Sequence, residues 1–134
     1  MAVAINFVMD QGTLFEAIAT IQNDDGSIFD LTDMVAYCQM KRSYFTHSAI
    51  TITAEVYGTP SEGKIKLSLL PHETDKIKAC RYVYDVEVHD VNDSNYVKRV
   101  LQGVITVSPQ ATKIPASFNF NVESGETVIA DALN

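Results

Sequence analysis

The residues best placed to do chemistry stand on one predicted strand, in segment 81–90. Asp85 and Glu87 lie two positions apart there, so both carboxylates leave the same face of an extended strand. A glycosidase also uses two carboxyl groups, but they face each other across a cleft, a separation that neighbours on one flat face do not provide. Because Arg81 and His89 share this face, we expect a solvated or subunit-facing polar surface without catalytic residues.

Two other groups have the chemistry of metal ligands. Segment 24–26 (Asp-Asp-Gly) followed by Asp30 offers carboxylates to a hard cation, but it lacks the ligand order and the terminal Glu of a calcium loop. A turn is the simpler interpretation of these residue types. His72 and Asp75 stand three apart with no third ligand nearby in sequence. We therefore predict no metal and no cofactor.

No motif of nucleophilic catalysis or phosphate binding is present: the chain has neither a G-x-S-x-G elbow nor a Gly-rich phosphate loop. Cys38 and Cys80 lack metal-ligand spacing, and the alternation of their segments points both inward from different strands. An inter-sheet disulfide is one interpretation. Two reduced thiols are the favoured one, since residues 1–9 lack the basic start and cleavage site of an export signal.

Alternation of apolar and polar residues predicts the elements that position these side chains. Tyr82, Tyr84, Val86 and Val88 point one way along 81–90, and a period of two indicates a half-buried strand. The same pattern predicts further strands at 13–22, 34–42, 50–57, 65–69 and 96–107, and segment 4–9 is a short apolar run before them. Regular turn signals between them favour one all-β domain over 1–113, an antiparallel β-sandwich of immunoglobulin-like or jelly-roll-like type.

Segment 71–79 interrupts this rhythm. Pro71 at its start, early acidic residues and late lysines favour one or two helical turns that bridge the two sheets. The position of Tyr82 directly after this bridge suggests a tyrosine corner.

Composition limits the partners. The 134 residues carry 10 basic and 17 acidic side chains, a net charge of −7, which argues against nucleic acid or an anionic membrane as a partner. No apolar stretch approaches membrane-spanning length. We expect a chain that is made in the cytoplasm.

The order of these features over residues 8–113 resembles a family of small virion β-sandwich proteins of tailed bacteriophages. That family opens with a Gln-Gly pair before an aromatic strand, then has an Asp-Gly turn and an Asp-Leu-Thr crossover. The matching residues here are Gln11, Gly12, Phe15, Asp25, Gly26, Asp30, Leu31 and Thr32. A Gln-x-Lys strand end and a Gly-x-Ile-x-Leu strand follow, matched by Gln39, Lys41, Gly63, Ile65 and Leu67.

The later part of the resemblance is a Tyr-x-Tyr-Asp-Val strand, a Leu-x-Gly and a final Val-x-Pro with a nearby Thr and basic residue. These are Tyr82, Tyr84, Asp85, Val86, Leu101, Gly103, Val107, Pro109, Thr112 and Lys113. The resemblance implies an immunoglobulin-like fold, a place in the virion, and other virion proteins and copies of itself as partners. Two departures stand out: segment 71–79 is more charged than is usual in the family, and residues 114–134 extend past the family's end.

That extension is interpreted as one more edge strand, a mobile end, or an arm on a neighbouring subunit; we favour an arm or an edge strand. An uncovered Phe-x-Phe segment would expose apolar surface, which favours a covered role. The residues expected to make its contacts are apolar: Ile114, Phe118, Phe120, Val122, Val128 and Ile129.

We therefore expect a non-enzymatic virion component of the tail or baseplate, which attaches fibres or braces neighbouring proteins. A capsid-surface cement or decoration protein is the first alternative, and a host-receptor or carbohydrate-binding module is the second. Sugar sites usually present exposed aromatic rings, whereas Trp is absent here and alternation places most Tyr and Phe side chains inward. An enzyme is the least favoured interpretation.

Overall fold

The computed structural model describes residues 2–112. The predicted arm 114–134, with its six contact residues, lies outside the described residues, as does Lys113. Within 2–112 the chain is almost entirely β-structure, which confirms the predicted fold class.

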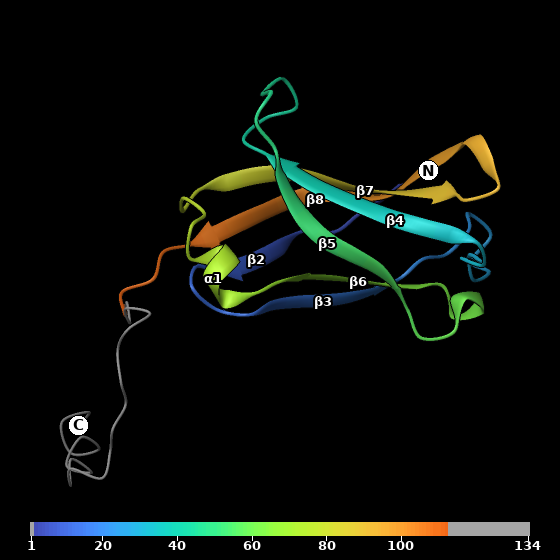
Figure 1. The fold of residues 1–134 in the computed structure, drawn as a ribbon, viewed down its shortest axis with the longest axis horizontal. Coiled ribbons are helices and arrows are strands. Elements are labelled where there is room, and N and C mark those ends of the chain that lie inside the picture. The colour runs from blue at the N-terminus through green and yellow to red at the C-terminus, as the bar shows by residue number, and fades with distance from the viewer. Residues whose placement is uncertain (1, 113–134) are drawn as a thin grey trace, which may run out of the picture.

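Among the described residues, the fold has eight strands, one short α-helix and one 3-10 turn (Figure 1). The strands are β1 (Val3–Ala4), β2 (Phe7–Asp10), β3 (Phe15–Thr20), β4 (Met34–Lys41), β5 (Ile50–Tyr57), β6 (Lys64–Leu69), β7 (Arg81–Asp90) and β8 (Asp93–Ser108). The helix is α1 (Pro71–Thr74), and the 3-10 turn spans Pro60–Glu62. The predicted strands at 50–57 and 81–90 have the bounds that the structure shows.

One strand belongs to both layers of the sandwich. The start of β5 pairs with β4, up to Ile52 opposite Cys38, and the remainder, from Thr53 onward, pairs with β6. The strands therefore follow one curled path in the order β1-β8-β7-β4-β5-β6-β3, with β2 also on β8. In Figure 1, β5 runs diagonally from the upper layer to the lower one. A strand that changes sheets is a known way of making the corner of a sandwich.

The sandwich is antiparallel except at its N-terminal edge. Both β1 and β2 run parallel to β8, with Val3 opposite Leu101 and Phe7 opposite Ile105. The predicted apolar run 4–9 thus falls on two short strands, which Ile5 and Asn6 separate. Parallel pairing is possible here because the whole domain separates the two partners in sequence, which leaves ample chain for the connection.

Gly103 allows the N-terminal segment to approach β8 closely at the break between β1 and β2. A Cβ at this position would collide with the carbonyl oxygen of Ile5, so only glycine lets the N-terminal segment pass. The Ile5 oxygen accepts a hydrogen bond from the Tyr84 hydroxyl at 2.7 Å, and Tyr84 is the strand partner of Gly103. Two motifs of the family resemblance, Tyr-x-Tyr and Leu-x-Gly, therefore meet at one structural contact.

Gln11 is a second tie between distant segments. Its Nε2 donates to the Ile77 carbonyl at 2.8 Å, and its Oε1 accepts from the Gln110 backbone N at 3.1 Å. The following Gly12 has φ of +79°, and a Cβ there would collide with the Gln110 side chain. The Gln-Gly pair thus joins the turn before β3 to the bridge after α1 and to the end of β8.

The predicted tyrosine corner is present. The Tyr82 hydroxyl donates to the Lys78 carbonyl at 2.7 Å, four residues upstream and just before β7. The predicted helical bridge is α1, which begins with Pro71 and has its first turn capped by the Glu73 carboxylate on the Leu70 backbone N. The corner and the strand order favour the immunoglobulin-like alternative over the jelly roll.

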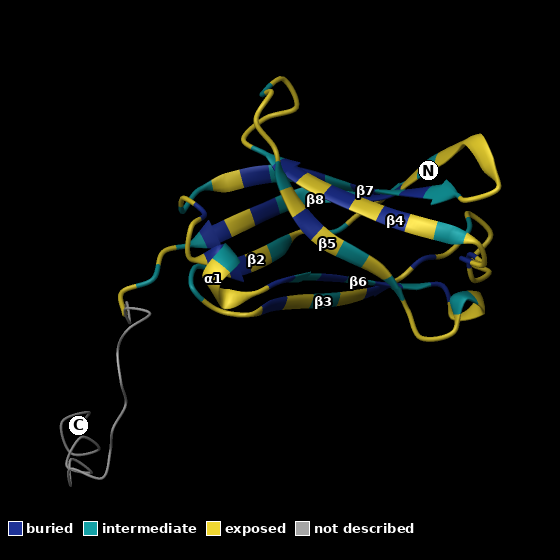
Figure 2. Cartoon of the chain, in the orientation of Figure 1, coloured by how far each residue is buried: buried dark blue, intermediate teal, exposed yellow. Residues whose placement is uncertain are grey.

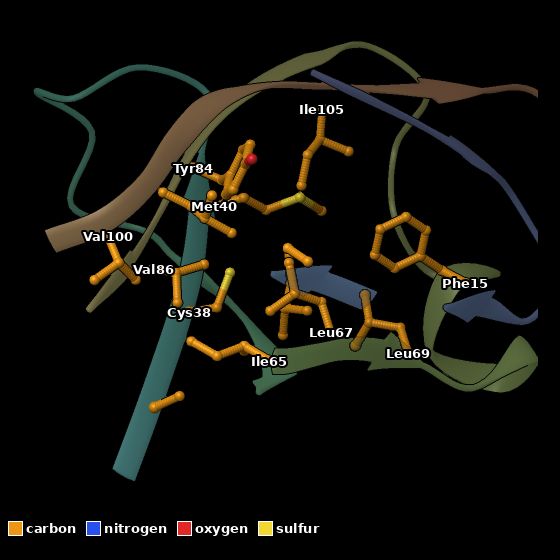
Figure 3. Close-up of a cluster of buried hydrophobic side chains, with 14 of the residues drawn as sticks. Phe15, Cys38, Met40, Ile65, Leu67, Leu69, Tyr84, Val86, Val100 and Ile105 are labelled. Carbon is orange, nitrogen blue, oxygen red and sulfur yellow. The ribbon is translucent and has the colours of Figure 1, made fainter. Parts of the chain in front are cut away.

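The core lies between the two layers and follows the predicted alternation (Figures 2 and 3). Buried and exposed residues alternate along β4 in Figure 2. In Figure 3, Tyr84, Met40 and Ile105 of one layer face Leu67 and Leu69 of the other. All five side chains are nearly inaccessible, so the predicted inward faces of these strands are confirmed.

Both cysteines are free thiols, as favoured from the sequence. Cys38 is buried in the core, and Cys80 is half-buried near the start of β7. Burial, with a smaller contribution from the negative charge of Asp85, raises the pKa of Cys38 to about 12. Its thiol is therefore protonated near neutral pH and is a poor nucleophile.

Candidate functional site

A groove of about 580 Å³ opens where β5 diverges from β4. Its walls are residues 36–39 of β4, residues 51–54 of β5 and three side chains of β7: Asp85, Glu87 and His89. We call this set of residues the groove. The side chains of Cys38 and Ile52 are buried in the core, so the groove presents chiefly the outward-facing side chains of these strands, such as Tyr37, Gln39 and Thr51.

The predicted polar face is only partly assembled in this groove. Asp85, Glu87 and His89 line it together, as their spacing on one strand predicted. Arg81 does not line it, because it is the first residue of β7, opposite Thr106 of β8, and is exposed there. The interaction residue that the sequence reasoning grouped with the other three thus lies away from the groove.

Basic side chains accompany both groove carboxylates. Arg99 Nε lies 3.4 Å from Asp85 Oδ2, and His89 Nε2 lies 3.3 Å from Glu87 Oε1. Burial is the largest influence on Asp85 and raises the pKa of its carboxyl; Glu87 acts in the same direction, while the positive charge of Arg99 opposes both. The two carboxylates are neighbours on one wall, so they do not face each other across a substrate as a glycosidase pair does.

Sequence reasoning missed the residues that β4 and β5 contribute. Tyr37 is 57% exposed, and its ring packs edge-on against His89 with a centroid distance of 4.9 Å. Gln39 Nε2 and Thr51 Oγ1, 3.4 Å apart, continue the polar wall. The alternation of β4 already places Tyr37 and Gln39 outward, opposite to Cys38, so this signal was available. The sequence has no signal for the divergence of β5 from β4 next to Tyr37 and Gln39.

A second surface lies at the tip of the β4–β5 hairpin, which projects at the top of Figure 1. Tyr44 and Phe45 are exposed there, Phe45 to 92%. The turn is closed by the Thr46 N to Ser43 O hydrogen bond at 3.1 Å and by a contact of 3.0 Å between the Ser43 and Thr46 hydroxyls. We call residues 42–47 the aromatic tip.

Half of the ten described Tyr and Phe side chains are exposed, so the expectation that most of them face inward is not met. Phe45 and four tyrosines are exposed among the described residues: Tyr37, Tyr44, Tyr57 and Tyr96. Tyr44 and Phe45 lie in a turn, where strand alternation makes no statement about direction. The other three lie on the outward faces of strands.

The acidic segments at Asp25 and Asp30, which the sequence assigned to turns, do form turns. Asp25 Oδ1 accepts hydrogen bonds from the N and Oγ of Ser27 at 2.9 and 2.6 Å, and Asp30 does the same with Thr32. These hydrogen bonds lower the pKa of both carboxyls, and the bond from the hydroxyl has the larger effect in each case. Within residues 2–112, no three His, Cys, Asp or Glu side chains gather closely enough to hold a metal ion. No helix in this range has the length and apolar character needed to cross a membrane.

Comparison with known proteins gives only distant likeness. No family model matches the chain, and no curated protein matches it by sequence. Among solved structures, it is similar to an internalin-like protein of Listeria monocytogenes, with 14% identity over 80% of this chain and a TM-score of 0.42. It is also similar to the SrpA adhesin of Streptococcus sanguinis, with 12% identity over 86% of this chain and a TM-score of 0.43. The chain spans 28% and 59% of those two proteins, respectively.

Proposed function

We propose that this chain is a non-enzymatic structural component of a tailed-bacteriophage virion, in the tail or baseplate, that acts through contacts with other virion proteins. The observation that carries the proposal is the role of the residues behind the family resemblance. Gln11, Tyr82 and Gly103 each tie together segments that are distant in sequence or join a loop to a strand. They maintain a scaffold, which leaves function to its surfaces.

Those surfaces suit protein partners. Strand β3 is at one end of the strand order, and Ile18 on it is 50% exposed. An exposed strand edge invites pairing with another chain. The aromatic tip adds apolar surface of the kind that is enriched at the centre of protein interfaces.

The test is to cross-link purified particles and identify the neighbours of this chain by mass spectrometry. Cross-links to tail or baseplate proteins, with a copy number that matches the tail symmetry, would support the proposal. Cross-links to the major shell protein, with a copy number near that of the shell, would instead identify a capsid cement protein. Absence of the chain from purified particles would refute both.

The predicted arm has its own test. A chain that lacks residues 114–134 is expected to fold, because described residues form a buried core, but to fail to join particles. Its circular dichroism spectrum and urea transition should match those of the full chain. Normal incorporation of the truncated chain would show that the arm is not a clamp, and failure to fold would make it part of the core.

Sugar binding is a second candidate that the groove specifically favours. The exposed Tyr37 ring lines the same groove as the Gln39 amide and the Asp85 carboxylate, and sugar sites combine such a ring with polar groups. Glycan-array binding by the wild-type chain, lost in Tyr37→Ala and kept in Tyr57→Ala, would support this function. A uniformly negative array would eliminate it.

A further inference from the structure

Strand β3 has an edge without a partner. It pairs with β6 along its whole length, and among residues 2–112 no strand pairs with its other side. Soluble proteins usually protect such an edge with proline, lysine, a bulge or a very short strand. The six residues of β3 contain no Pro and no Lys, and their pairing has no register shift. The one charged side chain, Glu16, forms an ion pair with Lys66 at 3.0 Å, so the edge is open to strand addition.

The core next to this edge is incompletely covered. Ala17 packs against the core and is half-buried, whereas its register partner Leu67 on β6 is inaccessible. Phe15 of β3 contacts Phe7 of β2, with ring centroids 5.9 Å apart, and Phe7 is also half-buried. On the outer face of β3, Ile18 is 50% exposed. A further strand on this edge would remove apolar surface from water.

The described chain ends close to the start of β3. Asp10 at the end of β2 is the strand partner of Ser108 at the end of β8. Gln110 N then donates to Gln11 Oε1 at 3.1 Å, in the turn that leads into β3. Figure 1 shows the end of β8 and the start of β3 at the same end of the sandwich. The arm, residues 114–134, therefore begins a few residues from the free edge.

Part of the arm has the sequence of a half-buried strand. Apolar residues alternate with asparagines in segment 117–122: Phe118, Asn119, Phe120, Asn121 and Val122. In an extended conformation the apolar side chains share one face. The six residues of this segment match the length of β3, so its rings would cover Ala17 while its amides face solvent.

We propose that segment 117–122 of one copy adds as a strand to the free edge of β3 in a second copy. This inference rests on the proposed role of residues 114–134 as an arm, and it names the surface that receives the arm. The direction of the chain favours a second copy. An arm that runs along the edge from the start of β3 is parallel to its own β3, but antiparallel to that of a copy related by a two-fold axis. Antiparallel pairs are slightly more stable per residue.

The exchange is reciprocal, because each copy gives one arm and receives one around the two-fold axis. The two arms lie side by side between the two β3 strands, so each arm crosses two strand spacings, about 10 Å. Residues 113–116 span about 13 Å when extended, which is sufficient. Main-chain hydrogen bonds supply the affinity in such strand addition. Since each arm must be ordered when it docks, we expect association only at about 0.1–1 mM.

Sedimentation equilibrium of the full chain up to about 1 mM measures this association. The wild type should approach the mass of two copies as concentration rises. Phe118→Ser/Phe120→Ser and Ala17→Lys should each associate at least about tenfold more weakly, because the first removes the rings and the second puts an inward-pointing charge on the edge. The matched arm control, Val128→Ser/Ile129→Ser, should associate as the wild type does. A urea transition establishes that each variant is folded.

Disulfide formation locates the contact. In a Cys80→Ser background, Ile18→Cys copies mixed with Asn119→Cys or Asn121→Cys copies should form a covalent dimer. The reason is that Ile18 and the asparagines would share the outer face of adjacent strands. Val35→Cys, at an exposed position of β4, is the control and should not cross-link to either arm position. Mass spectrometry of the linked peptides identifies the joined residues.

Three results would overturn the inference. A wild type that stays monomeric up to about 1 mM would do so, and the virion proposal would still stand or fall by its own cross-linking test. Unchanged association in Ala17→Lys would assign the contact to another surface. A chain with both Ile18→Cys and Asn119→Cys that closes its disulfide within one copy at low concentration would place the arm on its own β3.

Discussion

Replacing Gly103 by alanine is the sharpest test of how the N-terminal segment is held against β8. A Cβ at this position collides with the backbone carbonyl oxygen of Ile5, and backbone cannot move aside as a flexible side chain can. The N-terminal segment must therefore shift away from β8. We expect Gly103→Ala to fold but to be clearly less stable than the wild type.

The magnitude follows from the bonds around that contact. Ile5 N donates to Gln102 O at 2.9 Å, Tyr84 donates its hydroxyl to Ile5 O at 2.7 Å, and the Val104 N donates to Asn6 Oδ1 at 3.0 Å. A hydrogen bond contributes about 0.5–1.5 kcal/mol, and overpacking costs about 1–3 kcal/mol. Partial loss of the bonds, together with the strain that remains, lowers the free energy of unfolding by about 2–4 kcal/mol.

Urea denaturation followed by circular dichroism measures this difference, with an unchanged m-value to establish that the transition is comparable. The matched control is Gly26→Ala. Gly26 has φ of +89° with no atom within 4 Å of an added Cβ, so only the backbone conformation is penalised, by about 1–2 kcal/mol. A loss in Gly103→Ala no larger than that in Gly26→Ala would refute the reasoning.

A double-mutant cycle tests the same contact by a second route. Tyr84→Phe by itself removes the hydroxyl that donates to Ile5 O and should cost about 1 kcal/mol. In the Gly103→Ala background that bond is already displaced, so the second substitution should cost almost nothing. Strictly additive losses would show that Gly103 and Tyr84 do not act on one carbonyl.

Three further predictions concern the other ties. Tyr82→Phe removes the hydroxyl that donates to the Lys78 carbonyl and should lower the free energy of unfolding by about 1–2 kcal/mol in urea; no loss would mean that the corner contributes nothing. Gln11→Ala removes the bonds to Ile77 and Gln110 and should cost about 2 kcal/mol, measured as a lower thermal midpoint; an unchanged midpoint would contradict the tie. Burial, followed by interaction with the neighbouring thiol, raises the pKa of Tyr82 from 10.0 to about 12, so the fold favours the protonated phenol. The stabilisation that the protonated phenol contributes is complete below pH 10 and is lost as the pH rises towards 12. Over this range the midpoint of urea unfolding should therefore fall less steeply with pH in Tyr82→Phe than in the wild type.

The strands were largely predictable because one face of each is buried. A period of two in residue polarity reflects that condition directly, so β5 and β7 have the predicted bounds and Tyr82, Tyr84, Val86 and Val88 point inward. The tyrosine corner was predictable for a related reason. It depends on a contact between residues four apart, which lies within the reach of local reasoning.

Irregularities of the sheet were not predictable from the same pattern. A register shift in the pairing of β7 with β8 lies between Val86 and Glu87 and leaves Val100 outside the pairing, so Val100 and Leu101 are both buried although they are adjacent in sequence. Such a bulge depends on the partner strand, and the alternation of β8 by itself does not report it. The parallel pairing of β1 and β2 is equally non-local.

By itself, the sequence determined that this protein is an all-β sandwich, which faces of its regular strands point to the core, and that Asp85, Glu87 and His89 share one face. Tertiary structure decided what lies opposite that face. The groove exists because β5 pairs with β4 only as far as Ile52 and then joins β6, and this choice is made by the packing of two layers against a common core. A pattern of period two specifies the direction of a side chain, whereas a site requires the relative position of strands, which only long-range contacts set.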